Sequence, residues 1–258
     1  MATDRVNLNA DMGEGFGAYD MGDDTRLLTI VASANVACGM HAGDPNVMHR
    51  VLSAARVNGV SVGAHAGFND LWGFGRRAIE MTPWDLELLV TYQIGALQAV
   101  ATHVGTSVTH LKAHGALYNM AAERHDYALA IGRAAAKVDP ALVYVAPDGS
   151  AMQAAAAELG LPMACEAFVD RAYEDDGSLT PRSRPGAVVT DPAEAAQRAV
   201  RMVRRQAVPT RSGGELPRRV DSLCVHGDSP GAVDVGEAVR TALEAAGIAV
   251  VTLPELMS

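Results

Sequence analysis

The stretch Arg5-Val6-Asn7-Leu8-Asn9-Ala10-Asp11, close to the N-terminus, decides the fold. Its residues alternate between apolar and polar, and this is the period of a β-strand, because successive side chains of a strand point to opposite faces. One face carries Val6, Leu8 and Ala10, and the other carries Asn7, Asn9 and Asp11. The strand is therefore expected to have an apolar face and a polar face.

Similar short runs recur along the whole chain and alternate with longer Ala- and Leu-rich stretches that are typical of helices. The eight predicted strands are Arg5–Ala10, Ser33–Ala37, Val60–Ala64, Ser107–Lys112, Leu142–Ala146, Pro162–Ala167, Asp221–Val225 and Ile248–Thr252. This alternation predicts parallel βαβ units, and a parallel sheet is covered on both faces. The polar face then cannot be wet surface, so we predict a closed α/β barrel. Its polar residues line the lumen and gather at the carboxyl ends of the strands.

Three helices have clear start or stop signals. Helices over Thr82–His103 and Asp191–Arg205 each begin with a capping side chain followed by proline, which suits the first turn. A third helix is predicted between Pro230 and Ala246, with Gly247 as its stop. Two further segments, Gly67–Ala78 and Arg171–Val189, are predicted to be a long loop and a hairpin or flap. Such segments often carry function.

The bulk properties exclude several classes of protein. With 258 residues, 49% of them hydrophobic, and no low-complexity linker, the chain is expected to form one domain over residues 1–258. A net charge of −9 argues against a nucleic-acid partner, because that affinity comes from Lys and Arg. The N-terminus lacks the pattern of a secretory signal, and no apolar run reaches the ~20 residues of a membrane span. A cytoplasmic protein is therefore expected, with its three cysteines as buried thiols.

Ionisable side chains follow the carboxyl ends of several predicted strands. The set comprises Asp11, His65, Lys112, His114, Glu166, Asp170, His226 and Asp228. Burying such groups costs several kcal/mol per ion unless they are paired, so a functional explanation is favoured over a structural one. Lys112 is one of only two lysines among the 21 Lys and Arg residues. A chain that avoids lysine but keeps one on an inward face is expected to need its ammonium group.

For other polar residues both a structural and a functional interpretation are open. Asn7 and Asn9 are either satisfied amides of the barrel floor or contacts to a substrate. His41 lies just before a helix that Asp44 can cap, and it is predicted to be functional. The remaining histidines, His49, His103 and His125, fall within predicted helices and are expected at the surface.

Cofactor signals in the chain are limited. Asp11, His65 and His114, together with His226 and Asp228, have the ligand chemistry of a Zn²⁺ or Mn²⁺ site, but spacing alone does not decide whether a metal binds. The glycines after Asp11 do not follow a dinucleotide-binding order, and no GxxxxGK[ST] phosphate loop occurs in the sequence.

Taken together, the motifs resemble those of the LamB/YcsF family, and the resemblance covers nearly the whole chain. It is carried by Asn7–Glu14 (NLNADMGE), Asn35–Asp44 (NVACGMHAGD), Gly63–His65 (GAH), His114–Asn119 (HGALYN), Asp170–Tyr173 (DRAY), Pro181-Arg182 and Cys224–Asp228 (CVHGD). The resemblance implies an irregular seven-stranded barrel similar to polysaccharide deacetylases, so one of the eight predicted strands would be surplus. It also implies cleavage of 5-oxo-L-proline to L-glutamate driven by ATP, in a complex with two other 5-oxoprolinase subunits.

That activity gives the candidate residues possible roles. Opening an unstrained lactam requires a base for water, for which Asp11 or His114 is a candidate, and an acid for the ring nitrogen, for which His65 or His226 is a candidate. Lys112 can stabilise phosphate or oxyanion charge. The residues expected to contact the substrate are Asn7, Asn9, Glu14, His41, Glu166, Asp170, Arg171, Arg182 and Asp228.

Two other functions are compatible with the same residues. The first is a metal-dependent deacetylase acting on a carbohydrate or an amide, which the deacetylase-like fold and the Asp/His set both allow. The second is a non-catalytic subunit whose lumen holds a small acid while its partners carry out the reaction. The many proton-transfer groups in the predicted lumen favour an enzyme.

Overall fold

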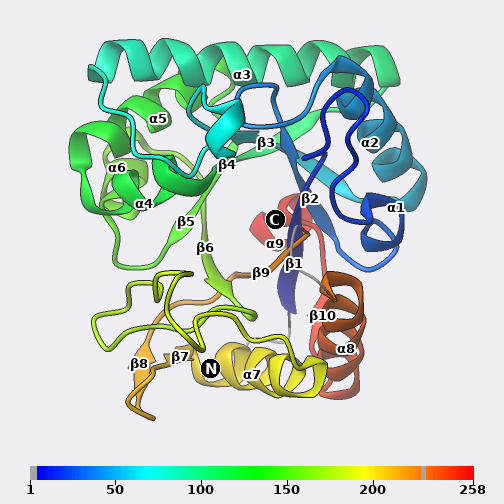
Figure 1. Cartoon of the computed structure of the whole chain (residues 1–258), viewed down its shortest axis with the longest axis vertical. Helices are drawn as coiled ribbons and strands as arrows, with labels where there is room; N and C mark the ends of the chain where they lie inside the picture. The colour runs from blue at the N-terminus through cyan, green and yellow to red at the C-terminus, as the bar shows by residue number, and fades with distance from the viewer. Residues whose placement is uncertain (1–4, 228–230) are drawn as a thin grey trace.

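A closed barrel of seven parallel strands forms the centre of the computed structural model, which describes residues 5–227 and 231–258 (Figure 1). Asp228, expected to contact the substrate, and Pro230 lie outside the described residues. The seven strands are β1 (Arg5–Met12), β2 (Ser33–Ala37), β3 (Ser61–Ala66), β4 (Val108–Ala113), β5 (Val143–Pro147), β6 (Met163–Phe168) and β9 (Ser222–His226). They follow one another around the ring, and β9 pairs with both β6 and β1 to close it. The predicted α/β barrel is confirmed.

The eighth predicted strand exists but stays outside the ring. It is the short β10 (Ala249–Val250), which pairs only with Arg5 and Val6 at the start of β1. β10 can pair there because β2 pairs with β1 only from Asn9 onward, which leaves Arg5 and Val6 of β1 available to β10. The seven-stranded ring that the family resemblance implies is therefore correct, and the surplus strand is β10.

Helices surround the barrel, as Figure 1 shows, with α7 and α8 packed side by side. They are α1 (Asp24–Leu27), α2 (Pro45–Asn58), α3 (Pro83–Val104), α4 (Gly115–Glu123), α5 (His125–Val138), α6 (Ala151–Leu159), α7 (Pro192–Arg205), α8 (Ala232–Ala245) and α9 (Leu253–Met257). The predicted start signals are used as expected: the Thr82 side chain accepts from the backbone N–H of Asp85, and that of Asp191 from the N–H of Ala193. Apolar side chains beneath these helices and on the outer strand faces form the main core.

A second, smaller apolar cluster lies at the amino ends of the strands. Val143 and Val145 of β5 and Ala164 of β6 point into the lumen, since they pair in register with the inward His110 and Lys112. Leu253 at the start of α9 packs against them and is fully buried. The barrel is thus closed at this end by apolar packing, and its polar groups gather at the other end.

The segments between β6 and β9 form small antiparallel structures. Within Arg171–Val189, isolated bridges join Arg171 to Val188 and Tyr173 to Leu179, which confirms the predicted hairpin or flap. Within residues 207–217, β7 (Ala207–Pro209) and β8 (Glu215–Pro217) pair as a short antiparallel ribbon. Gly67–Ala78 is a long loop that contains a single 3₁₀ turn, η1 (Leu71–Gly73). No helix in residues 5–227 and 231–258 is long and apolar enough to cross a membrane.

Candidate functional site

Polar side chains fill the lumen in layers, because inward residues recur at every second position of each strand. The deepest layer, here called the floor network, consists of Asn7, Ser33, Ser61 and Ser222. The Asn7 amide donates to Ser33 Oγ at 2.7 Å and to the Val251 carbonyl at 2.8 Å, and its oxygen accepts from Ser222 Oγ at 2.7 Å. Of the two interpretations of Asn7, these contacts favour the structural one.

Asn9, one layer higher, joins the floor network to charged groups. Its amide donates to Ser222 Oγ at 2.7 Å and to Glu166 Oε1 at 3.1 Å. Its oxygen accepts from Asn35, whose amide also donates to Asp11 Oδ1 at 2.9 Å. Asn35 was not singled out from the sequence, although it lies within a motif that carries the family resemblance. The inward period of β2 could have identified it.

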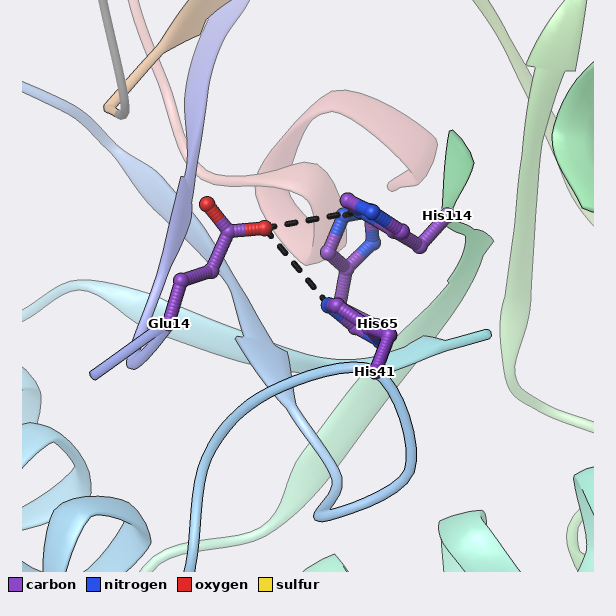
Figure 2. A group of neighbouring side chains, drawn as sticks. All are labelled: Glu14, His41, His65 and His114. Atoms are coloured by element: carbon purple, nitrogen blue, oxygen red, sulfur yellow. Dashed lines mark hydrogen bonds and ion pairs between the residues drawn. The ribbon is translucent and has the colours of Figure 1, made fainter. Parts of the chain in front are cut away.

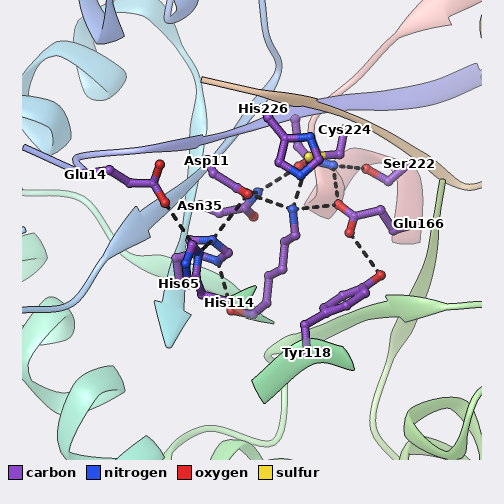
Figure 3. Close-up of polar contacts among 12 residues, drawn as sticks. Asp11, Glu14, Asn35, His65, His114, Tyr118, Glu166, Ser222, Cys224 and His226 are labelled. Carbon is purple, nitrogen blue, oxygen red and sulfur yellow. Dashed lines mark hydrogen bonds and ion pairs between the residues drawn. The ribbon is translucent and has the colours of Figure 1, made fainter. Parts of the chain in front are cut away.

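The centre of the site is an ion cluster, here called the charged triad, of Asp11, Lys112 and Glu166. Figure 3 labels Asp11 and Glu166 of this cluster. Lys112 Nζ lies 2.8 Å from Asp11 Oδ1 and 3.1 Å from Glu166 Oε1, and it also donates to Cys224 Sγ at 3.1 Å. All three charged residues are buried. Strands β1, β4 and β6 therefore bring together three residues that are far apart in sequence, as predicted.

The charges within the triad stabilise one another. Burial alone would lower the pKa of Lys112, but the neighbouring Asp11 and Glu166 carboxylates raise it well above its usual value. Burial alone would raise the pKa of Asp11, but His65 and Lys112 hold it well below the usual range. Asp11 is therefore a carboxylate and Lys112 an ammonium ion at neutral pH.

Asn35 also contacts His110, a buried histidine of β4, and both residues pair in register with Gly63 of β3. His110 Nε2 donates to Asn35 Oδ1 at 3.1 Å, and burial lowers the pKa of His110 to about 3. The ring fits because Gly63 on β3 has no side chain: a Cβ there would lie 2.1 Å from a ring carbon of His110. The neutral imidazole fixes the Asn35 amide, and Asn35 in turn orients Asp11.

Four buried residues lie together at the carboxyl ends of β1, β2, β3 and β4, and Figure 2 shows their side chains converging. This set, here called the ligand group, is Glu14, His41, His65 and His114. His65 Nε2 lies 2.9 Å from His114 Nδ1 and 3.3 Å from Asp11 Oδ2, so the ligand group touches the charged triad. Sequence reasoning placed Glu14 and His41 among the substrate contacts and proposed Asp11 with His65 and His114 as metal ligands.

The loop Gly67–Ala78 covers the ligand group. The Phe74 carbonyl accepts from His114 Nε2 at 2.8 Å, and the Phe74 ring packs edge-on against the His114 ring. Gly75, with φ +63°, lies so close that a Cβ would come within 2.8 Å of both His41 and His114. A side chain at that position would push the loop off the imidazoles.

His226 and Asp170 form a separate ion pair at the same end of the barrel. His226 Nδ1 lies 2.9 Å from Asp170 Oδ2, and the imidazole stacks on the Phe168 ring at a centroid distance of 5.2 Å. Burial would raise the pKa of Asp170, but His226 lowers it below the usual value. Tyr118, which residue-level reasoning missed, donates to Glu166 Oε2 at 3.2 Å from the start of α4.

The arginines of the flap lie in different environments. Arg171 is buried, and its guanidinium donates to the carbonyls of Thr180 and Ala187 within the flap. Arg182 is exposed, and its charge helps to lower the pKa of Asp170. Arg76, not predicted from the sequence, lies over the Phe74 ring at 4.9 Å. The helical histidines, His49, His103 and His125, are exposed as expected.

Two surface hollows lie away from these groups. One of about 440 Å³ lies at the amino ends of β4 and β5 and is lined by Ser107, Val143 and Met257 among others. The other, of about 650 Å³, lies between α7 and α8. Neither contains a residue of the charged triad or the ligand group, and the chemistry of the buried side chains identifies the site better than the size of a hollow.

Solved structures share the fold of this chain. The catalytic domain of a peptidoglycan N-acetylglucosamine deacetylase from Eubacterium rectale superposes with a TM-score of 0.51 at 12% identity, covering 97% of this chain and 88% of that one. A structure described as T48 deacetylase with substrate gives 0.52 at 17% identity, covering 98% and 90%. Likeness at this level concerns the fold alone. The protein is thus a deacetylase-like α/β barrel with a buried, charged site at the carboxyl ends of its strands.

The chain belongs to the LamB/YcsF family, whose family model matches residues 6–258. It is 52% identical over 248 residues to a protein of Rhodopseudomonas palustris strain BisB5 named as the A subunit of 5-oxoprolinase, covering 96% of this chain and 98% of the relative. A Heliobacterium modesticaldum protein of the same name is 50% identical, covering 95% and 97%. The crystal structure of a lactam utilization protein from Thermus thermophilus superposes with a TM-score of 0.92 at 45% identity, covering 96% and 100%.

Proposed function

We propose that this chain is the subunit of a 5-oxoprolinase that opens the lactam ring of 5-oxo-L-proline to give L-glutamate, with ATP hydrolysis and two partner subunits. The names of its relatives support this assignment. The observation that carries it is the charged triad, a buried ammonium ion between two carboxylates. A reaction that moves charge needs such groups, and apolar side chains in their place could not serve it. Buried ion pairs add little to stability, so stability alone does not explain the triad.

The reaction explains why these residue types are needed. A five-membered lactam is an unstrained amide, and phosphorylation of its oxygen by ATP makes the ring carbon open to attack. Water then adds to that carbon, the ring C–N bond breaks as the nitrogen gains a proton, and a second water releases phosphate. The products are L-glutamate, ADP and phosphate. Each step requires a base, an acid or a stabilised negative charge.

The described residues can supply each of these roles. Asp11 is ionised and held by Lys112 and Asn35, so it suits the base that takes a proton from water. Lys112 suits the stabilisation of phosphate or oxyanion charge. His226, paired with Asp170, is the candidate that can give the proton to the ring nitrogen. The cationic Arg182 is suited to the substrate carboxylate.

Nucleotide binding is assigned to the complex with its partner subunits. The chain contains no GxxxxGK[ST] loop, and the floor of the barrel is closed by apolar packing. We therefore expect the isolated chain to show little or no ATP-coupled turnover and the reconstituted complex to release glutamate and ADP in equal amounts. Robust turnover by this chain alone would contradict the assignment of nucleotide binding.

The Asp11→Asn variant tests whether this chain carries the chemistry. It keeps the size of the side chain but removes the charge and the basic oxygen, so turnover of the complex should fall about 10²-fold or more. Asp20→Asn is the matched control, because the Asp20 side chain is 86% exposed. If Asp11→Asn turns over normally while calorimetry shows 5-oxoproline binding, the chain is a non-catalytic binding subunit.

The ligand group favours one alternative function, a metal-dependent deacetylase. That function would need no ATP and no partner subunit. The test is release of acetate from acetylated chitooligosaccharides or acetylated amides by the zinc-loaded chain alone. Acetate release without ATP, together with no glutamate from the complex, would replace the proposed function with this one.

A further inference from the structure

The ligand group has the composition of a transition-metal site. It contains three imidazoles and one carboxylate, and one ligand atom from each lies within 4.8 Å of all the others. All four residues are buried, His41 completely. Imidazole nitrogen and carboxylate oxygen are ligands that Zn²⁺ prefers, and four of them match its usual coordination number.

Backbone carbonyls fix the tautomers of two of the imidazoles. The Lys112 carbonyl lies 3.2 Å from His65 Nδ1, and the Phe74 carbonyl lies 2.8 Å from His114 Nε2. A carbonyl oxygen can only accept, so each of these nitrogens carries a proton. In the neutral rings the lone pairs are then on His65 Nε2 and His114 Nδ1, which face each other at 2.9 Å. This outer-shell arrangement is typical of histidines that bind metals.

His41 provides the independent observation. Neither of its ring nitrogens makes a hydrogen bond within the part of the chain that the structure describes, although the side chain is completely buried. Its ring stacks on the His114 ring at a centroid distance of 3.7 Å, and Nε2 lies 3.5 Å from Glu14 Oε1. Burying an imidazole without a hydrogen bond costs free energy, so Nε2 of His41 is expected to have a partner in the functional protein.

A positive charge belongs between these atoms. Two facing nitrogen lone pairs and a carboxylate oxygen 3.4 Å from His114 Nδ1 repel one another unless a cation lies among them. A metal cation bound among these atoms would remove the repulsion, because the imidazole nitrogens and the carboxylate oxygen would direct their lone pairs at it.

We propose that Glu14, His41, His65 and His114 bind one divalent transition-metal ion, with Zn²⁺ the best match to the donor set. The site goes beyond the proposed function, since metal binding requires neither 5-oxoproline nor ATP. A bound divalent ion supplies a Lewis acid beside the charged triad. Asp11 lies outside the four ligands, because Lys112 and Asn35 hold its Oδ1.

The experiment uses the full-length chain after removal of metals with a chelator. Titration with ZnCl₂ in a calorimeter should show one equivalent of tight binding, and Zn²⁺ should raise the melting temperature. Co²⁺ should bind at the same site and give the visible absorption of a tetrahedral centre. His41→Ala and Glu14→Gln should each weaken Zn²⁺ binding by about 10²-fold or more, the scale of losses seen even for outer-shell changes.

His49→Ala is the matched control, because His49 is an exposed histidine on α2 and should leave Zn²⁺ binding unchanged. Circular dichroism establishes whether each variant is folded. If His41→Ala is not folded, His41→Gln takes its place. Absence of stoichiometric binding to the folded wild-type chain, or equal binding by the folded His41 and Glu14 variants, overturns the proposal. An active complex with no metal would overturn this site and leave the proposed function intact.

Discussion

The floor network and the charged triad are built on the same inward strand faces, yet they differ in kind. Asn7 and Asp11 both project from β1 into the lumen, four positions apart. Asn7 meets hydroxyl groups and a carbonyl, and its amide oxygen and nitrogen are both hydrogen-bonded. Asp11 meets an ammonium ion and an imidazole. The floor is neutral and the mouth is ionic.

This difference separates stability from chemistry. Each satisfied neutral hydrogen bond contributes about 0.5–1.5 kcal/mol to the free energy of unfolding. A buried ion pair contributes little to the free energy of unfolding, since the attraction between its charges mainly offsets the cost of removing both charges from water. Changes in the floor should therefore lower stability and spare turnover, whereas changes in the triad should lower turnover most.

The largest effect is expected for Lys112→Met in the reconstituted complex. Loss of the ammonium removes the group suited to stabilising negative charge, so kcat should fall by about 10³-fold. The variant also leaves Asp11 and Glu166 buried without a cation, which should lower the melting temperature. Steady-state kinetics and thermal denaturation measure the two effects.

The double variant Lys112→Met, Glu166→Gln separates these effects. It removes one of the two stranded charges, so the melting temperature should recover in part while kcat stays low. If kcat recovers with the melting temperature, Lys112 acts only through stability, and the distinction between floor and mouth fails.

The second prediction concerns the floor. Asn7→Ala removes the hydrogen bonds to Ser33 Oγ, Ser222 Oγ and the Val251 carbonyl and opens a small cavity, so the free energy of unfolding should fall by about 2–3 kcal/mol. kcat of the complex should change less than about twofold, because the Asn7 side chain bonds to the floor serines and the Val251 carbonyl. Urea unfolding and kinetics provide the two measurements. Asn58→Ala, at the exposed end of α2, is the control. A large loss of kcat in Asn7→Ala would show that the floor network takes part in the reaction.

The smallest effect concerns pH and His110, which lies between the two regions. Its pKa is about 3 in the folded protein and about 6.5 in the unfolded chain. Between these values the unfolded state binds the extra proton, so acidification below about pH 6.5 lowers stability. One such group contributes about 1.4 kcal/mol per pH unit.

His110→Gln can keep the donor to Asn35 without titrating. Its free energy of unfolding should therefore depend less steeply on pH between about 6.5 and about 5, by roughly that one-proton amount. Urea unfolding of chelator-treated protein at several pH values measures the slope. An unchanged slope would mean that His110 is already protonated in the folded state.

Strand alternation predicted the regular part of the site. The period of two placed Asp11, Lys112 and Glu166 on inward faces, and parallel strands bring their carboxyl ends to one end of the barrel. This reasoning needs only local sequence, because a strand fixes the direction of each side chain.

The irregular part of the site could not be predicted in this way. Glu14 and His41 lie beyond the ends of β1 and β2, where no period fixes the direction of a side chain. The hydrogen-bond partner of His114 Nε2 is the Phe74 carbonyl. Every residue has such a carbonyl, so the sequence does not reveal which one the imidazole contacts. Arg171 has the chemistry of a substrate contact, yet its guanidinium bonds to carbonyls of the flap, which only the folded path of the chain reveals.

The packing of the barrel floor has a consequence for folding kinetics. Val6 of β1 pairs with Val250, and the Asn7 amide bonds to the Val251 carbonyl, 244 positions away along the chain. Contacts between residues so far apart in sequence form slowly, because the chain must lose the entropy of a very long loop before the contacts return any free energy. The hydrogen bonds of Asn7 to this segment are therefore expected to be among the last to form, and the deep end of the lumen stays open to water until they do.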